Sequence, residues 1–147
     1  MRALLLIALV ACGSSNGTPD FPADYATTYM EVRDCRPSID HDGENVRVMA
    51  SPTALAPYTN RTDPFPDGAI IVKEQYARTD STCSGAIQDY SVMMRVENGD
   101  APLLPQWDWQ HVDANRGVIS EDIKRCTSCH ADCAHQGVGY AGTCEEP

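Results

Sequence analysis

The sequence CTSCH at residues 126–130 constrains this chain more than any other feature, because its three reactive side chains must share one face of a helix. Cys-x-x-Cys-His is the attachment signature of haem c. Residues three and four positions apart lie on the same side of a helix, so both thiols and the imidazole point the same way. We therefore expect one haem c per chain, bound through Cys126 and Cys129, with His130 as an axial ligand of the iron.

The first 22 residues carry export signals. Met1-Arg2 precedes the apolar run 3–11, which is shorter than the roughly 20 residues that span a bilayer. LVAC at residues 9–12 resembles a bacterial lipobox, in which Cys12 is lipidated; an ordinary signal that discards Cys12 or leaves it free is the alternative. We expect a lipoprotein signal peptide at 1–11, a flexible tether at 12–22 and one domain at 23–147. The protein would be exported and lipid-anchored to the bacterial cell envelope, facing the periplasm or the exterior.

The charge of the chain limits its partners. Asp and Glu number 21 and Lys and Arg number 11, one of which, Arg2, lies in the signal. This negative balance excludes direct attraction to nucleic acid or to an anionic lipid surface. We expect membrane contact through the lipid anchor only, and a basic redox partner protein.

Seven cysteines can be divided by function. Cys12 would be lipidated, and Cys126 and Cys129 would be bonded to haem. The remaining four cysteines can form two disulfides in an oxidising compartment, with three possible connectivities. The pairing that we favour is Cys35 with Cys83 and Cys133 with Cys144. Competing interpretations of the motif are a zinc site of Cys126, Cys129, Cys133 and either His130 or His135, a thioredoxin-like thiol pair, and unrelated disulfide cysteines. Export into the compartment where haem c is attached weighs against all three.

Hydrophobic periodicity predicts an α+β domain that is mostly β: an antiparallel sheet with an N-terminal helix and a C-terminal haem-bearing helix. Alternating apolar positions favour strands at 45–50, 68–76, 87–96 and 106–112. Helical spacing favours a helix at 22–32 and a helical turn at 51–57. Ser120 is the expected N-cap of the last helix, which would run to about residue 131 with Glu121 and Asp122 in its first turn.

The position of the motif argues against the commonest small cytochromes. Class I cytochromes c carry it near the N-terminus and use a later methionine as second ligand, whereas no methionine follows His130 here. The chain instead resembles the cytochrome P-460 family, which shares its fold with the β-type cytochromes c-prime. The resemblance covers roughly residues 25–135 and rests on five segments in order: NVRVMA at 45–50, FPDG at 65–68 leading into AIIVKE, residues 90–96, WDW at 107–109, and CTSCH.

This resemblance implies an antiparallel sheet, a homodimer and a five-coordinate haem that binds a small gaseous or nitrogen-oxide ligand. In hydroxylamine-oxidising members a lysine is joined to the haem, and it is absent from members that only bind nitric oxide or carbon monoxide. Lys73 is the candidate here, although a solvent-facing lysine that balances Glu74 explains it equally well. Asp108 is a candidate proton relay, or else a plain surface carboxylate. A third alternative is an electron-transfer cytochrome with His111 or a methionine as the sixth ligand.

Overall fold

The computed structural model describes residues 17–135 and 140–144. The expected signal peptide and the lipidation site at Cys12 lie outside these residues. None of the described helices combines the length and the apolar character needed to cross a membrane.

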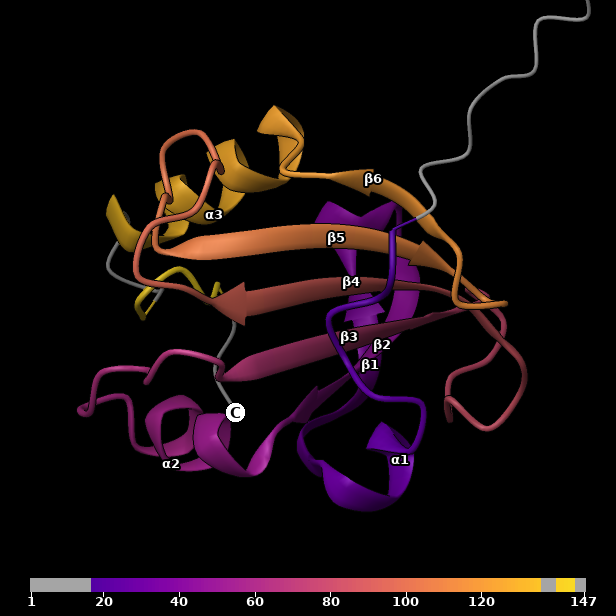
Figure 1. Cartoon of the computed structure of the whole chain (residues 1–147). Coiled ribbons are helices and arrows are strands. Elements are labelled where there is room, and N and C mark those ends of the chain that lie inside the picture. The colour runs from indigo at the N-terminus through magenta and orange to yellow at the C-terminus, as the bar shows by residue number, and fades with distance from the viewer. Residues whose placement is uncertain (1–16, 136–139, 145–147) are drawn as a thin grey trace, which may run out of the picture.

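One six-stranded sheet organises the fold (Figure 1), and its strands lie side by side in chain order, β1 to β6, each antiparallel to its neighbours. The fold is therefore α+β and mostly β, as the sequence predicts. The elements are α1 Tyr25–Thr28, β1 Met30–Ser38, the 3-10 turn η1 Ile39–His41, β2 Glu44–Ala50, α2 Pro52–Asn60, β3 Ile70–Tyr76, β4 Ile87–Arg95, β5 Trp107–Asp113, β6 Val118–Glu121 and α3 Lys124–His135.

Alternation along the strands gives the sheet two buried faces. On one face, Ile71, Met93 and Trp109 form a core with side chains of α2 and with Cys126 and Ala131 of α3. On the other, Val72 and Val92 pack under three aromatic rings of the N-terminal segment, those of Phe21, Tyr25 and Tyr29. The site described below lies on the α3 face.

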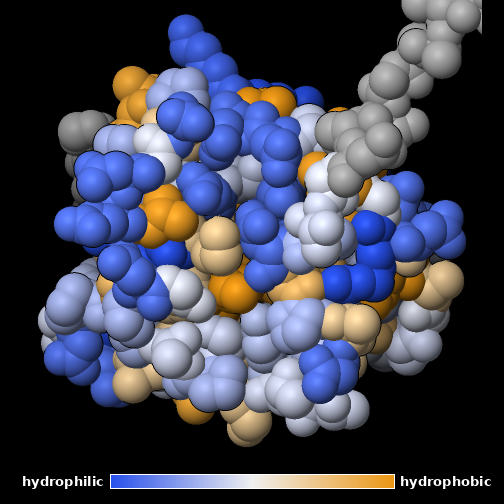
Figure 2. All heavy atoms as spheres, viewed as in Figure 1, coloured by the Kyte–Doolittle hydropathy of each residue, from blue (hydrophilic) through white to orange (hydrophobic). Residues whose placement is uncertain are grey.

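The N-terminal segment crosses in front of β5, β4 and β3 before it reaches α1 (Figure 1). Arg116 fixes it: the guanidinium donates to the Phe21 carbonyl at 2.5 Å and lies 4.1 Å from the centre of the Phe21 ring. Figure 2 shows the same side of the molecule as mostly hydrophilic, with apolar residues in small separate areas. Apolar area on this side is therefore covered by the protein's own chain.

Two predicted helices begin or end elsewhere. The helix expected at 22–32 is confined to α1, and β1 starts at Met30, because the segment pairs with β2 from Met30 onward. The last helix begins at Lys124 and has no acidic residue in its first turn. Ser120 and Glu121 belong to β6, and Asp122 bonds to the sheet edge: its carboxylate accepts the Trp109 N–H at 3.0 Å. Pairing with β5 thus replaces the expected N-cap.

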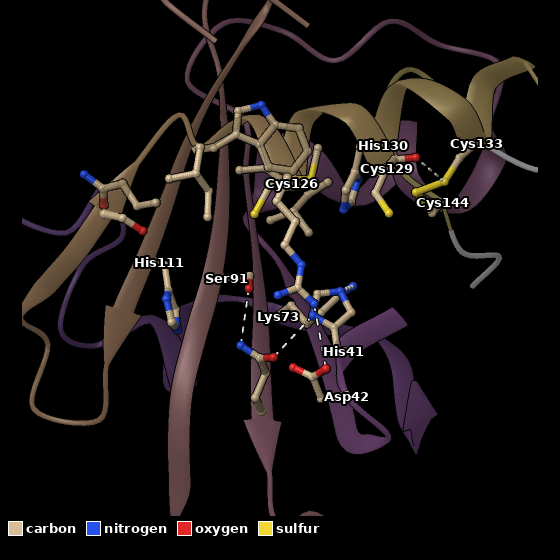
Figure 3. Close-up of a pocket in the computed structure, with 18 of the residues that line it drawn as sticks. His41, Asp42, Lys73, Ser91, His111, Cys126, Cys129, His130, Cys133 and Cys144 are labelled. Atoms are coloured by element: carbon tan, nitrogen blue, oxygen red, sulfur yellow. Dashed lines mark hydrogen bonds and ion pairs between the residues drawn. A yellow bond between two sulfur atoms is a disulfide. The ribbon is translucent and has the colours of Figure 1, made fainter. Parts of the chain in front are cut away.

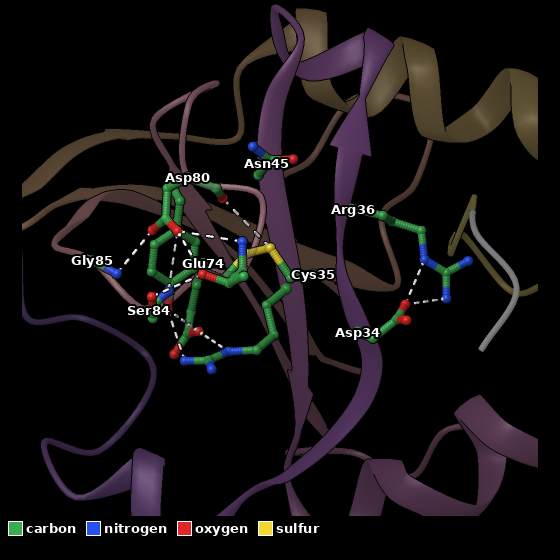
Figure 4. Close-up of a disulfide and its surroundings, with 12 residues drawn as sticks. Asp34, Cys35, Arg36, Asn45, Glu74, Asp80, Ser84 and Gly85 are labelled. Atoms are coloured by element: carbon green, nitrogen blue, oxygen red, sulfur yellow. Dashed lines mark hydrogen bonds and ion pairs between the residues drawn. A yellow bond between two sulfur atoms is a disulfide. The ribbon is translucent and has the colours of Figure 1, made fainter.

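A disulfide between Cys35 and Cys83 ties β1 to the loop between β3 and β4 (Figure 4). That loop is organised by Asp80, whose carboxylate accepts the Gly85 N–H at 2.8 Å and the Thr82 hydroxyl at 3.2 Å. These hydrogen bonds hold the pKa of Asp80 below its ordinary value. The edge strand β1 is in this way joined covalently to the middle of the sheet.

Candidate functional site

Three side chains of α3 line one cavity between this helix and the sheet. Cys126, Cys129 and His130 share a helix face because they lie three and four residues apart. The cavity has a volume of about 470 Å³, within the usual range for cofactor and ligand sites. In Figure 3 all three project from α3 toward a space that Lys73 and His41 approach from the opposite side.

The bonding of the cysteines separates these two thiols from the rest. Among the described residues Cys126 and Cys129 are the free cysteines, and the structure has the favoured pairing, Cys35 with Cys83 and Cys133 with Cys144. Because Cys133 is in a disulfide, it is not available for the four-ligand zinc site considered above. Burial raises the pKa of the Cys126 thiol, against the positive charges of Arg125 and Lys73.

One nitrogen of the His130 ring is hydrogen-bonded to the backbone. Nδ1 lies 2.6 Å from the Gly142 carbonyl oxygen. A carbonyl only accepts, so Nδ1 carries the hydrogen and Nε2 carries the lone pair that a metal would use. The ring also packs edge-on against Trp109, with ring centres 4.5 Å apart. His130 therefore has a fixed tautomer and a fixed plane.

Gly142 brings its carbonyl to His130 through a conformation that side chains disfavour. Its φ is +93°, and a Cβ added there would lie 3.0 Å from Trp107 Nε1. The Trp107 indole donates to the neighbouring Ala141 carbonyl at 2.7 Å. The disulfide from Cys133 to Cys144 holds the same segment against α3. These contacts set the orientation of the helix histidine from outside the helix.

The sheet wall of the cavity changes from apolar to polar in successive rows. Ile71, Met93 and Trp109 are cross-strand neighbours and form the apolar row, which includes the ring that packs on His130. The next row along the strands is polar and consists of Lys73, Ser91 and His111. A flat ligand between α3 and the sheet would have an apolar wall near His130 and hydrogen-bonding groups further along.

Lys73 is in this polar row, and its amine contacts a histidine. Its Nζ lies 2.8 Å from Nε2 of His41, on η1. Burial and the Lys73 charge lower the pKa of His41 to about 4. The imidazole is consequently neutral at physiological pH, and the structure brings Lys73 to the cavity of the Cys-x-x-Cys-His motif rather than leaving it on an exposed strand face.

Comparison with known protein families identifies the family of this chain. The family model described as Cytochrome P460 matches residues 22–140. The chain belongs to the cytochrome P460 family. No curated protein matched the sequence. Membership in this family implies that the chain binds haem c.

The cavity fits the haem that membership in the cytochrome P460 family implies. The two free thiols and the imidazole that attach such a group face it together. The side chains of Ile71, Met93 and Trp109 give an apolar wall that suits the flat, largely apolar macrocycle. Arg125, which also lines the cavity, offers a positive charge to acidic haem substituents.

Asp108 is not brought to the cavity. It alternates with Trp107 and Trp109, whose rings pack in the core on the α3 face, so its carboxylate lies on the other side of the sheet. Its pKa is raised by burial and by the carboxylates of Asp122, Asp100 and Glu121. A proton-relay role for Asp108 has no support in this arrangement, and we do not propose it further.

Several cavity residues were not identified from sequence. His41, Gln75 and Arg125 line the cavity, and the clearest signal was that of Gln75, because it alternates with Lys73 on β3. His41 reaches the site from η1, a turn that no periodicity indicates. Its one local sign is the Asp42-Gly43 pair that follows, where both residues have positive φ.

Proposed function

We propose that this protein is an exported mono-haem c protein that binds small nitrogen oxides at an open iron position, and that it oxidises hydroxylamine. One observation carries the proposal: Lys73 and the attachment residues Cys126, Cys129 and His130 line the same cavity. In the cytochrome P-460 family a lysine at the haem accompanies hydroxylamine oxidation. The position of Lys73 therefore favours that branch over the gas-binding members without the lysine.

Each group of the chain has a separate part in this function. The thiols of Cys126 and Cys129 would hold haem covalently, and His130 Nε2 would bind the iron. The haem, when bound, supplies ligand binding and electron transfer at iron. Ile71, Met93 and Trp109 exclude water from one side of the cavity, while Lys73 and Ser91 offer hydrogen bonds on the other.

The surroundings of Met93 and His111 support an open position rather than a second protein ligand. Met93 is 6% exposed and packs in the core with Ile71 and Trp109. His111 Nε2, the nitrogen that would reach a metal most easily, lies 3.5 Å from an Asp89 carboxylate oxygen. The imidazole of His111 is thus directed at Asp89, and the Met93 side chain is packed in the apolar wall of the cavity.

Oxidation of hydroxylamine to nitric oxide releases three electrons and three protons, so the function requires an electron acceptor. We propose a basic redox protein, which the acidic balance of the chain would attract. A lipid on Cys12 would keep the domain at the envelope surface where such a partner is encountered.

The test is spectroscopic and uses the full chain produced with haem attachment in a periplasm. The wild type is compared with Lys73→Met and with Lys124→Met, which removes the only other lysine and leaves Lys73 in place. Absorption spectra of oxidised and dithionite-reduced protein, a haem stain on a denaturing gel, and binding of nitric oxide and hydroxylamine are recorded.

We expect a stained band, rapid binding of both ligands, and a strongly red-shifted reduced Soret band in wild type and Lys124→Met only. A stained wild type with an ordinary Soret band, unchanged by Lys73→Met, would contradict hydroxylamine oxidation and would support gas binding as the function. Resistance to nitric oxide and cyanide would indicate a six-coordinate electron carrier. No stain from correctly matured protein would contradict the haem function as a whole.

A further inference from the structure

A continuous set of hydrogen bonds runs across the polar wall of the cavity. Lys73 Nζ meets His41 Nε2 at 2.8 Å, and His41 Nδ1 meets Gln75 Oε1 at 3.2 Å. Gln75 Nε2 then donates to the Asp89 carboxylate and, at 3.3 Å, to the Ser91 hydroxyl. Figure 3 shows His41 beside Lys73, with Ser91 nearby on the sheet.

The hydrogen-bonding direction can be assigned from the Gln75 end. The amide nitrogen can only donate, and its two acceptors are the Asp89 carboxylate and Ser91 Oγ. This leaves Oε1 to face His41, so His41 Nδ1 must carry a hydrogen and donate it. In the neutral ring Nε2 is then the acceptor, and Lys73 Nζ donates to it. One side-chain amide thereby fixes the tautomer of the histidine that meets the lysine.

The backbone around His41 is fixed as well. The Gly43 N–H donates to the Ser38 carbonyl at 3.0 Å and closes the turn that contains His41. Gln75 is 6% exposed, and its amide nitrogen is hydrogen-bonded to Asp89 and Ser91 on β4. His41, which contacts Lys73, and Gln75, which contacts His41, therefore both have restricted positions.

We infer that His41 is a positioning residue for Lys73, and that Gln75 makes it one by fixing the His41 tautomer. This inference rests on the proposed function in so far as Lys73 acts at the haem. A lysine side chain has four rotatable bonds, and an acceptor at 2.8 Å selects among its conformers at the cavity wall.

The network holds Lys73 in place and does not conduct protons. A proton path needs groups that can accept and release a proton in turn, and the Gln75 amide between His41 and Asp89 does not do so at ordinary pH. Three charged groups surround His41: Lys73 on β3, Asp42 beside it on the turn and Arg125 on α3. Burial and Lys73 dominate and hold the His41 pKa at about 4, so its acceptor nitrogen is available through the physiological range.

The decisive measurement is the His41 tautomer, read from imidazole ¹⁵N shifts by NMR. The full chain is used in the reduced, carbon monoxide-bound state, in which low-spin iron is diamagnetic. We expect a neutral ring with hydrogen on Nδ1 from pH 8 down to about pH 5. Gln75→Leu should convert it to a mixture of tautomers, and Lys73→Met should raise its pKa. Ile39→Ala, at a residue of the same turn that is 92% exposed, should change neither.

A second measurement asks whether His41 acts through Lys73. His41→Leu should weaken hydroxylamine binding severalfold, and His41→Gln should restore most of it, because its amide can accept near the Nε2 position. The double variant His41→Leu/Lys73→Met should be no weaker than Lys73→Met alone, which is the non-additivity expected of two residues in one contact.

Hydrogen on Nε2 in the wild type, or additive losses in the double variant, would overturn the inference. The proposed function fails separately. A wild-type chain that carries no haem would contradict that function, yet such a chain is itself diamagnetic, and its tautomer spectrum would still decide the role of His41.

Discussion

At the scale of single residues, the buried carboxylate of Glu74 shows how the sheet tolerates a charge in its interior. Glu74 is 1% exposed and accepts from the Tyr25 hydroxyl at 2.7 Å and the Tyr76 hydroxyl at 2.8 Å. Arg47 donates to it at 2.6 Å. Burial, followed by the bond to Glu74, raises the pKa of both tyrosines. Tyr25, Tyr76 and Arg47 are all donors, so the Glu74 carboxylate accepts a hydrogen bond from each of them.

Replacing this acid should therefore be costly. Glu74→Gln keeps the shape but leaves the Arg47 charge unpaired and puts an amide N–H among donors. We expect a loss of about 2–4 kcal/mol in the free energy of unfolding. Urea unfolding with the disulfides intact measures it. Glu97→Gln, at an exposed position, is the matched control and should change stability by less than about 0.5 kcal/mol. Equal effects of the two substitutions would contradict the role of the network.

At the residue scale, the sequence predicts position best where spacing alone determines it. The helix face shared by Cys126, Cys129 and His130 follows from positions three and four apart, and Lys73 was found through family resemblance. The hydrogen bond from His130 to the Gly142 carbonyl and the contact of Lys73 with His41 join segments 12 and 32 residues apart. No local pattern encodes such pairs, because they depend on strand register and on the path of turns.

At the scale of elements, the N-terminal segment is held to the far face of the sheet by bonds around Gln110. The Gln110 amide accepts from the Asp20 N–H at 2.8 Å and donates to the Thr18 carbonyl and to Glu121. The Asp20 carboxylate lies in the same region, close to the acidic groups of Asp108, Glu121 and Asp122. Burial and these like charges raise the Asp20 pKa to about 6.

This shift predicts how stability depends on pH. Unfolded Asp20 loses its proton near pH 4 and the folded group only near pH 6, so the native state binds more protons between these values. Stability conferred by the protonated form is lost as the pH rises through this window. Asp20→Asn should then stabilise the protein by about 1 kcal/mol at pH 7.5, after allowance for solvent screening, and by almost nothing at pH 3.5. Urea midpoints at both values test this, with exposed Asp67→Asn as the control; a gain at pH 3.5 as large as that at pH 7.5 would contradict it.

Sequence periodicity located the strands that are rich in apolar and β-branched residues. These are β2 to β5, and each was expected within about two residues of its observed bounds. β1 was missed because its sequence, MEVRDCRPS, carries charges on both faces and a proline, which an edge strand tolerates. β6 was taken for a helix start because Ser-Glu-Asp is a capping pattern, and pairing with β5 outweighed it. Tertiary pairing decides such marginal segments.

At the scale of the whole molecule, two disulfides restrict different parts of the chain. Cys133 and Cys144 are 11 residues apart and close a short loop at α3, while Cys35 and Cys83 are 48 apart and link the edge strand to the sheet centre. The even remainder of four cysteines predicted two bonds, and only the three-dimensional arrangement selects one connectivity. A domain of this size with a charged edge strand gains from such a link, because β1 contributes few apolar side chains to either core.

The long-range disulfide should consequently carry more of the global stability. The chain-entropy relation gives about 4 kcal/mol for a loop of this length and about 3 kcal/mol for the shorter one. Cys35→Ala/Cys83→Ala should therefore lower the unfolding free energy more than Cys133→Ala/Cys144→Ala, as measured by urea unfolding of haem-loaded protein. The haem spectrum distinguishes the two disulfide variants as well. Loss of the α3 disulfide frees the Gly142 segment and should alter the haem spectrum through His130, whereas loss of the β1 disulfide should leave the spectrum unchanged. A spectral change in the β1 variant at full folding would show that the edge strand acts on the site.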